Sequence, residues 1–185
     1  MTRMSLVVLV VAALAWSQAV TGQQRPSGVV GDLLADVTEV ESKITSLATA
    51  LPEAAWGWRP STDVRSSAEV VVHVAADNYV IPAALGIAVP SDIGIDVRRF
   101  ESVAAFEKRP RTRQQAMSEL AASFAFLKQH IGATSDAQLG STIEGFGQPT
   151  TRRAMWIGAT THLHEHLGQL IAYARSNGVV PPWSR

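Results

Sequence analysis

The sequence contains no cysteine among its 185 residues. Disulfide bonds, thiolate metal ligands and the attachment residue of a lipoprotein are therefore excluded together. An excess of charge of one sign is also lacking, because 16 basic side chains balance 16 acidic ones. The basic residues form no stripe and no patch interleaved with aromatics. Such a chain offers the phosphate backbone no electrostatic footprint, so nucleic acid is not an expected partner.

The chain also lacks a hydrophobic run of the roughly 20 residues that a membrane-spanning helix needs. Its N-terminal run, Leu6–Trp16, has 11 residues, follows a short segment with one arginine and precedes small and polar residues. This arrangement predicts a secretory signal peptide over residues 1–22, cleaved after Ala19 or Gly22. An uncleaved anchor is the weaker alternative. We therefore expect an exported protein, periplasmic or extracellular, with no stable membrane anchor after cleavage.

The remaining residues, 23–185, are predicted to form a single domain, since 46% of the chain is hydrophobic and no repeat divides it. Three-four spacing of apolar residues and capping signals predict four helices. They cover about 28–50, Ser66 or Ser67 to Leu85, the Thr112 cap to about Ile131, and a Thr150 or Thr151 cap to Asn177-Gly178. We expect an all-α four-helix bundle with a long connection between the second and third helices.

The segments between these helices contain glycine and proline. Residues 86–110 are predicted to cross over the bundle, with a short helix around Glu101–Lys108. Trp56-Gly57-Trp58-Arg59-Pro60 predicts an aromatic loop, whose tryptophans either cover one end of the bundle or line a substrate site. The stretch Gly132–Pro149 is predicted to be a glycine- and serine-rich loop.

Three of the five histidines lie close together in the last predicted helix, at 162, 164 and 166. Because an α-helix advances about 100° per residue, His162 and His166 share a face and His164 points away from them. The pair occupies the apolar stripe, where two neutral imidazoles need partners, and one divalent ion would satisfy both. A third ligand must come from another element, and His73 in the second helix is the best candidate.

Alternatives to a three-histidine site stay open. Each histidine could be a hydrogen-bonded core residue without an ion. His162, Glu165 and His166 also satisfy the H-x-x-E-H pattern, in which Glu165 would be the general base of a zinc protease.

Two side chains near the predicted ligands could support them. Asp77 lies one turn after His73, and Gln169 lies three residues after His166, so both could orient imidazoles or a bound water. No residue is identified as catalytic, and Asp77 and Glu165 are the candidate carboxylates. His130 is expected to interact with the dipole at its helix end rather than with a metal.

Several sequence pieces occur together in a specific order. They are Trp58-Arg59-Pro60, Val64-Arg65-Ser66, His73-Val74-Ala75-Ala76-Asp77-Asn78, Thr151-Arg152, His162-x-x-x-His166-Leu167-Gly168-Gln169 and Tyr173–Pro182. In this order the chain resembles the DinB-like (DinB/YfiT) family of metalloenzymes over essentially its whole mature length. The resemblance implies a four-helix bundle and a divalent ion, often zinc or nickel, held by three histidines that map onto His73, His162 and His166. It also suggests a homodimer and implies no DNA chemistry.

The leading hypothesis is an exported metal-dependent enzyme of hydrolase or transferase type that acts on an unknown small-molecule substrate. Some relatives use low-molecular-weight cytoplasmic thiols, and a signal peptide would separate this chain from those thiols. The alternative is a non-enzymatic metal- or ligand-binding bundle. A closed shell of four ligands would favour binding, whereas an open position beside a cavity would favour catalysis.

Overall fold

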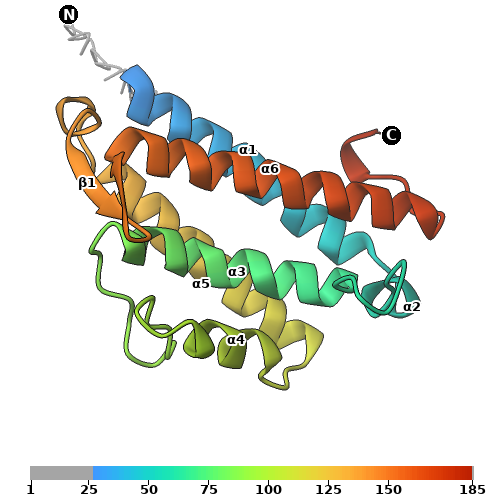
Figure 1. Cartoon of the computed structure of the whole chain (residues 1–185). Helices are drawn as coiled ribbons and strands as arrows, with labels where there is room; N and C mark the ends of the chain where they lie inside the picture. Colours follow the sequence, from blue (N-terminus) through green and yellow to red (C-terminus); the bar gives the residue numbers. More distant parts are fainter. Residues whose placement is uncertain (1–26, 185) are drawn as a thin grey trace, which may run out of the picture.

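The computed structural model describes residues 27–184, and its core is a bundle of four long helices (Figure 1). The helices are α1 (Gly28–Ala50), α3 (Ser67–Ala84), α5 (Arg113–Gly132) and α6 (Arg152–Ser176). Helices α1 and α3 each pack against both α5 and α6, so the four enclose one hydrophobic core. The expected four-helix bundle is confirmed. The predicted signal peptide lies outside the described residues.

Helix α3 is buried on most of its surface. Residues 70–72 and 74–76 are all buried, as a sequence that is apolar on every side requires. The predicted capping box forms at its start, where Ser66 Oγ accepts the backbone N–H of Glu69 at 3.3 Å and Glu69 Oε2 accepts that of Ser66 at 2.8 Å. The cap fixes where the helix begins, and His73 and Asp77 then fall on one partly exposed face.

The connection between α3 and α5 runs along the outside of the bundle. It contains α4 (Phe100–Lys108), which confirms the short helix predicted there. Helix α4 packs on α3 through the buried Phe106, and the Arg111 guanidinium lies 5.1 Å above the ring of that residue. This packing brings Glu107, the next residue, against α3.

The loop predicted over Gly132–Pro149 is wrong in part. The segment contains a 3-10 turn, η1 (Asp136–Gln138), and a hairpin of β1 (Thr142–Gly145) and β2 (Gln148–Thr151), which pair antiparallel. The turn between the strands places Phe146 at φ 52° and Gly147 at φ 74°. Two-residue hairpin turns of this kind are usually Asn-Gly or Asp-Gly, so Phe-Gly gives a weak sequence signal.

The predicted aromatic loop contains a single helical turn, α2 (Glu53–Trp56). Trp56 is buried, and the Arg113 guanidinium lies 4.8 Å from the centre of its ring. The ring of Trp58 meets Tyr173 of α6 edge-on at 5.3 Å. Both tryptophans therefore pack against the end of the bundle. A final 3-10 turn, η2 (Pro182–Ser184), packs on α1. Between residues 27 and 184, no helix combines the length and apolarity needed to cross a membrane.

Candidate metal centre

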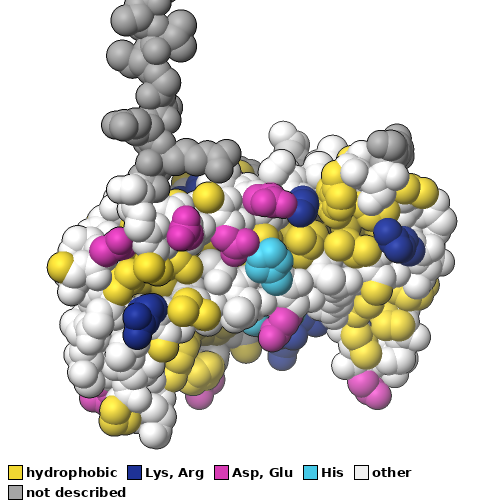
Figure 2. Space-filling view, turned by 90° about the horizontal axis from the view of Figure 1, so that it is seen from above, with side chains coloured by type: hydrophobic (Ala, Val, Ile, Leu, Met, Phe, Trp, Pro, Cys, Tyr) yellow, Lys and Arg dark blue, Asp and Glu magenta, His cyan; other side chains and the backbone are white. Residues whose placement is uncertain are grey.

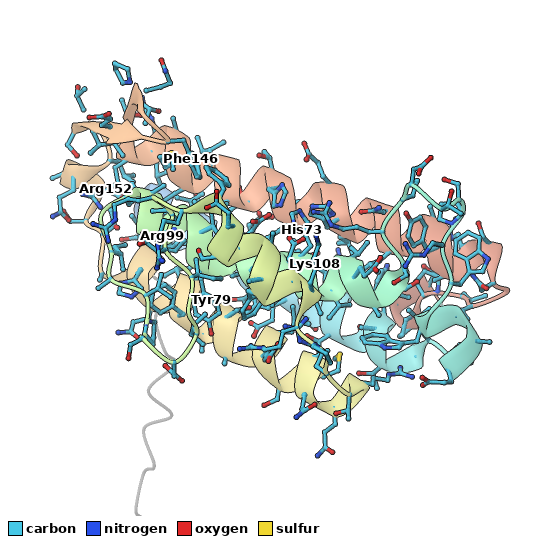
Figure 3. All side chains as sticks on the ribbon, turned by 60° about the horizontal axis from the view of Figure 1, so that its bottom comes forward. His73, Tyr79, Arg99, Lys108, Phe146 and Arg152 are labelled. Carbon is cyan, nitrogen blue, oxygen red and sulfur yellow. The ribbon has the colours of Figure 1, made fainter. Side chains whose placement is uncertain are left out.

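Four side chains from two facing helices converge in the bundle. His73 and Asp77 lie one turn apart on α3, and His162 and His166 lie one turn apart on α6. One potential ligand atom from each lies within 4.8 Å of those of the other three. Figure 3 shows His73 on the inner side of α4, near Lys108. The structure thus brings together the three predicted histidines, and it adds Asp77 to the same cluster.

The Asp77 carboxylate lies between imidazoles from both helices. Its Oδ2 is 2.6 Å from Nε2 of His162 and 3.1 Å from Nε2 of His73. The two Nε2 atoms of His162 and His166 are 3.1 Å apart. Four donors at about 2.05 Å from a tetrahedral ion would be about 3.3 Å from one another. These spacings of 2.6 to 3.1 Å are slightly shorter than this value, so small outward shifts of the side chains would fit an ion.

The other ring nitrogens face outward to polar partners. Nδ1 of His73 donates to Glu107 Oε1 at 2.6 Å, and Nδ1 of His166 donates to Gln169 Oε1 at 2.9 Å. Gln169 in turn donates from Nε2 to the Tyr173 hydroxyl at 2.8 Å. Histidines that bind metals usually donate their second N–H to a carboxylate or carbonyl in this way, which fixes the tautomer.

These tautomers create an electrostatic conflict that a cation would relieve. With Nδ1 protonated, Nε2 of His73 carries a lone pair directed at Asp77 Oδ2, which is also an acceptor, at 3.1 Å. Nε2 of His166 likewise points its lone pair into the cluster. Electron-rich atoms from two helices therefore face one small volume, and a divalent ion matches this donor set. The residues present fit a metal.

Burial and hydrogen bonding shift the pKa values of the ionisable groups in and beside the cluster in different directions. Burial lowers the pKa of His166, which keeps its imidazole neutral and available as a ligand. The hydrogen bond with Asp77 raises the pKa of His162, against the opposing effect of burial. The hydrogen bond from His73 holds the pKa of Glu107 below its usual value. Glu107 is therefore an anion beside the cluster at neutral pH.

The remaining candidates lie outside the cluster. The Glu165 side chain is 76% exposed, with Oε2 3.8 Å from Nδ1 of His162, so it stands at the solvent edge of the centre. His164 faces away, as predicted, and its Nε2 lies 2.9 Å from Asp36 Oδ1 of α1. His130 packs against the ring of Phe126 in the last turn of α5. In Figure 2, acidic side chains border the exposed histidine surface on the α1 and α6 side of the molecule.

Sequence reasoning missed Glu107. It lies in the short helix of the connection, 34 residues after His73, and its Oε2 also contacts Arg65 at 3.3 Å. Helical spacing within one element cannot show that another element brings a carboxylate to the histidine. The only available signal was the apolar Phe106 beside it, which marks the side of α4 that packs on the bundle.

Replacing Glu107 with alanine should weaken metal binding by about 10- to 100-fold, because His73 loses the acceptor that orients its ring and fixes its tautomer. Zinc affinity can be measured by competition with a chromogenic chelator. Glu101→Ala on the same helix is the matched control, since Glu101 is exposed. Equal affinities for Glu107→Ala and the unaltered protein would exclude this role.

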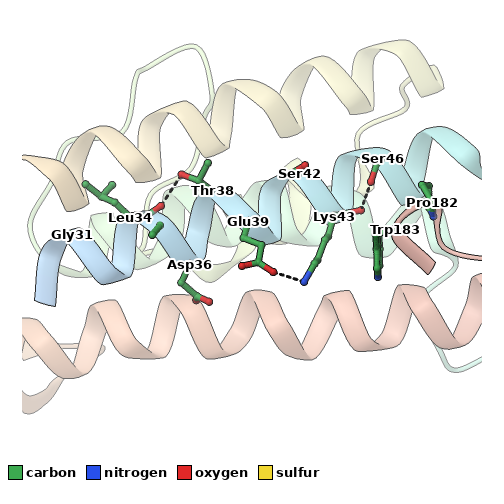
Figure 4. Close-up of a pocket in the computed structure, with 11 residues that line it drawn as sticks. Gly31, Leu34, Asp36, Thr38, Glu39, Ser42, Lys43, Ser46, Pro182 and Trp183 are labelled. Atoms are coloured by element: carbon green, nitrogen blue, oxygen red, sulfur yellow. Dashed lines mark hydrogen bonds and ion pairs between the residues drawn. The ribbon is translucent and has the colours of Figure 1, made fainter. Parts of the chain in front are cut away.

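A separate groove lies along the outer face of α1. It has a volume of about 1150 Å³ and is lined between Gly31 and Ser46 and by Trp183 near the C-terminus (Figure 4). Glu39 and Lys43, one turn apart on α1, form an ion pair along its wall at 2.5 Å. None of the four cluster side chains lines this groove, so it does not lead to the centre.

The chain is similar in sequence to one protein family and in fold to several solved structures. The model of the DinB superfamily matches residues 37–170. No curated protein matches the chain significantly. Among solved structures, a DinB-like protein from Bacillus cereus is 15% identical, with a TM-score of 0.66 over 83% of this chain and 95% of its own. A DinB-family protein from Exiguobacterium sibiricum is 22% identical, with a TM-score of 0.59 over 83% and 95%.

A third similar structure is YfiT from Bacillus subtilis. It is 12% identical to this chain, with a TM-score of 0.60 over 82% of this chain and 89% of its own. That protein is described as a probable metal-dependent hydrolase with an unusual four-helix bundle topology. At these identities the similarity establishes the fold alone.

Proposed function

Because this chain belongs to the DinB superfamily, we propose that it is a metal-dependent enzyme of the hydrolase or transferase type, with a divalent ion held by His73, His162 and His166. The observation that carries the proposal is the convergence of three imidazole Nε2 atoms. On the other side of each ring, Nδ1 of His73 contacts Glu107, Nδ1 of His166 contacts Gln169 and Nδ1 of His162 faces Glu165. The description of the Bacillus subtilis relative supports the same reaction class.

The residues around the centre have different roles in the proposed reaction. Glu107 and Gln169 hold the rings of His73 and His166 in the tautomer that directs Nε2 inward. Asp77 is the carboxylate within reach of the reacting atoms and accepts a proton there. A bound ion would polarise a carbonyl and lower the pKa of an attacking water or thiol toward neutrality. Imidazole ligands suit zinc and nickel, which we propose as the resident ion.

A second candidate function is a non-enzymatic metal-binding bundle, and one observation favours it. Asp77 Oδ2 lies as close to the imidazoles as a fourth ligand would, so three histidines and one carboxylate could close the shell. Solvent access favours the enzyme, because the His162 side chain is 28% exposed and that of Asp77 is 17% exposed. A purely structural ion is usually enclosed more completely.

Removal and return of the ion tests the enzymatic proposal. Protein treated with a chelator should hydrolyse an activated ester such as 4-nitrophenyl acetate at the uncatalysed rate, and zinc or nickel should restore hydrolysis. Magnesium or calcium should not restore it, because these ions prefer oxygen ligands. A hydrolysis rate unchanged by complete removal of metal would contradict the proposal.

A further inference from the structure

The exposed face of α3 changes from polar to apolar with distance from the candidate metal centre. His73 and Asp77 are followed on the same face by Ile81 and Ala84, at spacings of four and three residues. All four are partly exposed, whereas most of α3 is buried. The helix therefore presents two cluster residues and then apolar surface along one line.

Helix α4 shows the same change in the same direction. On α4, Glu107 contacts His73, and Val103 and Phe100 follow on its face toward the other end of the helix. On α6, Gly158 lies one turn before His162 on its solvent side. A Cβ built on Gly158 meets no atom within 4 Å, so the surface beside the centre is open there. We name Ile81, Ala84, Val103, Phe100 and Gly158 the apolar strip.

The apolar strip leads into a groove of about 1070 Å³. Ala84 and Phe100 belong to both, and Ile143 and Phe146 of the hairpin complete the apolar lining. We name this cavity the phenylalanine groove. Figure 3 shows Phe146 and Arg99 toward one end of α4, and His73 and Lys108 toward the other. The groove and the cluster of His73, Asp77, His162 and His166 therefore lie toward opposite ends of the apolar strip.

The backbone at the groove is strained. Phe146 has φ 52°, in the left-handed region that asparagine and glycine adopt much more readily, and its side chain is 52% exposed. An exposed ring adds little to the core, so folding does not explain a phenylalanine in this position. Phe100, also in the groove, is 68% exposed. Two exposed aromatic rings line the phenylalanine groove, and one is held in an unfavourable backbone conformation.

We propose that the substrate of this centre is an amphiphile, in which a carboxylic ester or amide reacts at the metal cluster and an unbranched acyl chain lies on the apolar strip and ends in the phenylalanine groove. This inference rests on the proposed function. From Glu107 to Phe100 the helix rises about 10 Å, which is the reach of a medium-length acyl chain. The cavity volume is ample for such a chain, and aliphatic and aromatic side chains line it together with the charged Asp96, Arg98 and Glu144.

Two substitutions test the strip without disturbing the core. Gly158→Leu places a side chain in open space on the strip and raises helix propensity. Gly168→Leu is its matched control, because Gly168 is exposed with equally open surroundings but lies about 120° around α6 from His162, whereas Gly158 lies about 40° from it. Phe146→Asn removes the ring and gives the turn a residue suited to positive φ, so that variant should be at least as stable as the unaltered protein.

The first measurement is calorimetric binding of decanoate, compared with acetate, to zinc-loaded and metal-free protein. Decanoate should bind the unaltered protein and the Gly168→Leu variant with equal affinity. Its affinity for Gly158→Leu and for Phe146→Asn should be at least about tenfold lower, since each buried methylene raises the binding constant by roughly a factor of four. This measurement needs no catalysis, so it tests the strip even if the centre proves not to be enzymatic.

The second measurement is hydrolysis of 4-nitrophenyl acetate and 4-nitrophenyl decanoate, in which water adds across the acyl C–O bond to give the carboxylic acid and 4-nitrophenol. The decanoate-to-acetate ratio of kcat/KM should fall at least about tenfold in Gly158→Leu and stay unchanged in Gly168→Leu. Equal binding of the two acids together with equal kcat/KM for the two esters would overturn the acyl-chain inference while leaving the metal-dependent function intact. A change of oligomeric state in Gly158→Leu, with chain-length preference unchanged, would assign the strip to a contact between two copies instead.

Discussion

Alanine at His162 or His166 should leave the purified protein without its divalent ion. In the proposed centre each of these histidines would supply one of three imidazole nitrogens, and their Nε2 atoms lie 3.1 Å apart, as two ligands of one ion would. Loss of an outer hydrogen-bond partner already weakens metal sites by about 10- to 100-fold, and loss of a ligand should exceed that. Elemental analysis of natively purified protein should give about one ion per chain before the change and almost none after it.

His164→Ala is the matched control for both variants. It removes an imidazole from the same helix, but His164 faces Asp36 of α1 and not the cluster. Metal content in this variant should equal that of the unaltered protein. Undiminished metal in His162→Ala or His166→Ala would remove the proposed centre, and with it the enzymatic function.

Asparagine at Asp77 should retain the ion but lose most of the activity. The change keeps the size of the side chain and removes the charge that accepts a proton within reach of the cluster, and such proton transfer typically contributes 10²- to 10⁴-fold to a rate. We expect kcat/KM for activated esters to fall within about that range, while zinc affinity falls by no more than the about 10- to 100-fold that loss of an outer hydrogen-bond partner costs. The two quantities are measured on the same preparation.

The same variant distinguishes the two candidate functions. If Asp77 closes a four-ligand shell, Asp77→Asn should release zinc as readily as a histidine variant does, and the non-enzymatic bundle would then be favoured. Asp92→Asn, at an exposed position in the connection before α4, is the control for removal of one negative charge. Neither quantity should change in that variant.

Local patterns in the sequence were sufficient for the long helices and for half of the centre. The Ser66 capping box fixed where α3 begins, and three-four spacing placed His162 and His166 on the inner face of α6. The sequence also made His73 the best candidate for the third ligand, and the family resemblance pointed to the same histidine. The structure brings the three histidines together, and their role as metal ligands remains a prediction.

Features that depend on two distant elements could not be predicted in this way. Glu107 reaches His73 only because the connection folds α4 back along α3, and no periodicity within α4 indicates that path. The hairpin was missed because Phe146-Gly147 is an unusual sequence for its turn. Asp77 was assigned a supporting role from its helical spacing, but its distance of 2.6 Å from a histidine on another helix required the packed bundle.

The separation of the cluster residues along the chain has a thermodynamic consequence. Asp77 and His162 are 85 residues apart, so their proximity exists only after α3 and α6 have docked. A bound ion would link these helices, and unfolding of the domain would require its release. A free-ion concentration a hundredfold above the dissociation constant would add about 2.7 kcal/mol to the free energy of unfolding. Resistance of the domain to heat and to proteases would thus follow the supply of the ion in its surroundings.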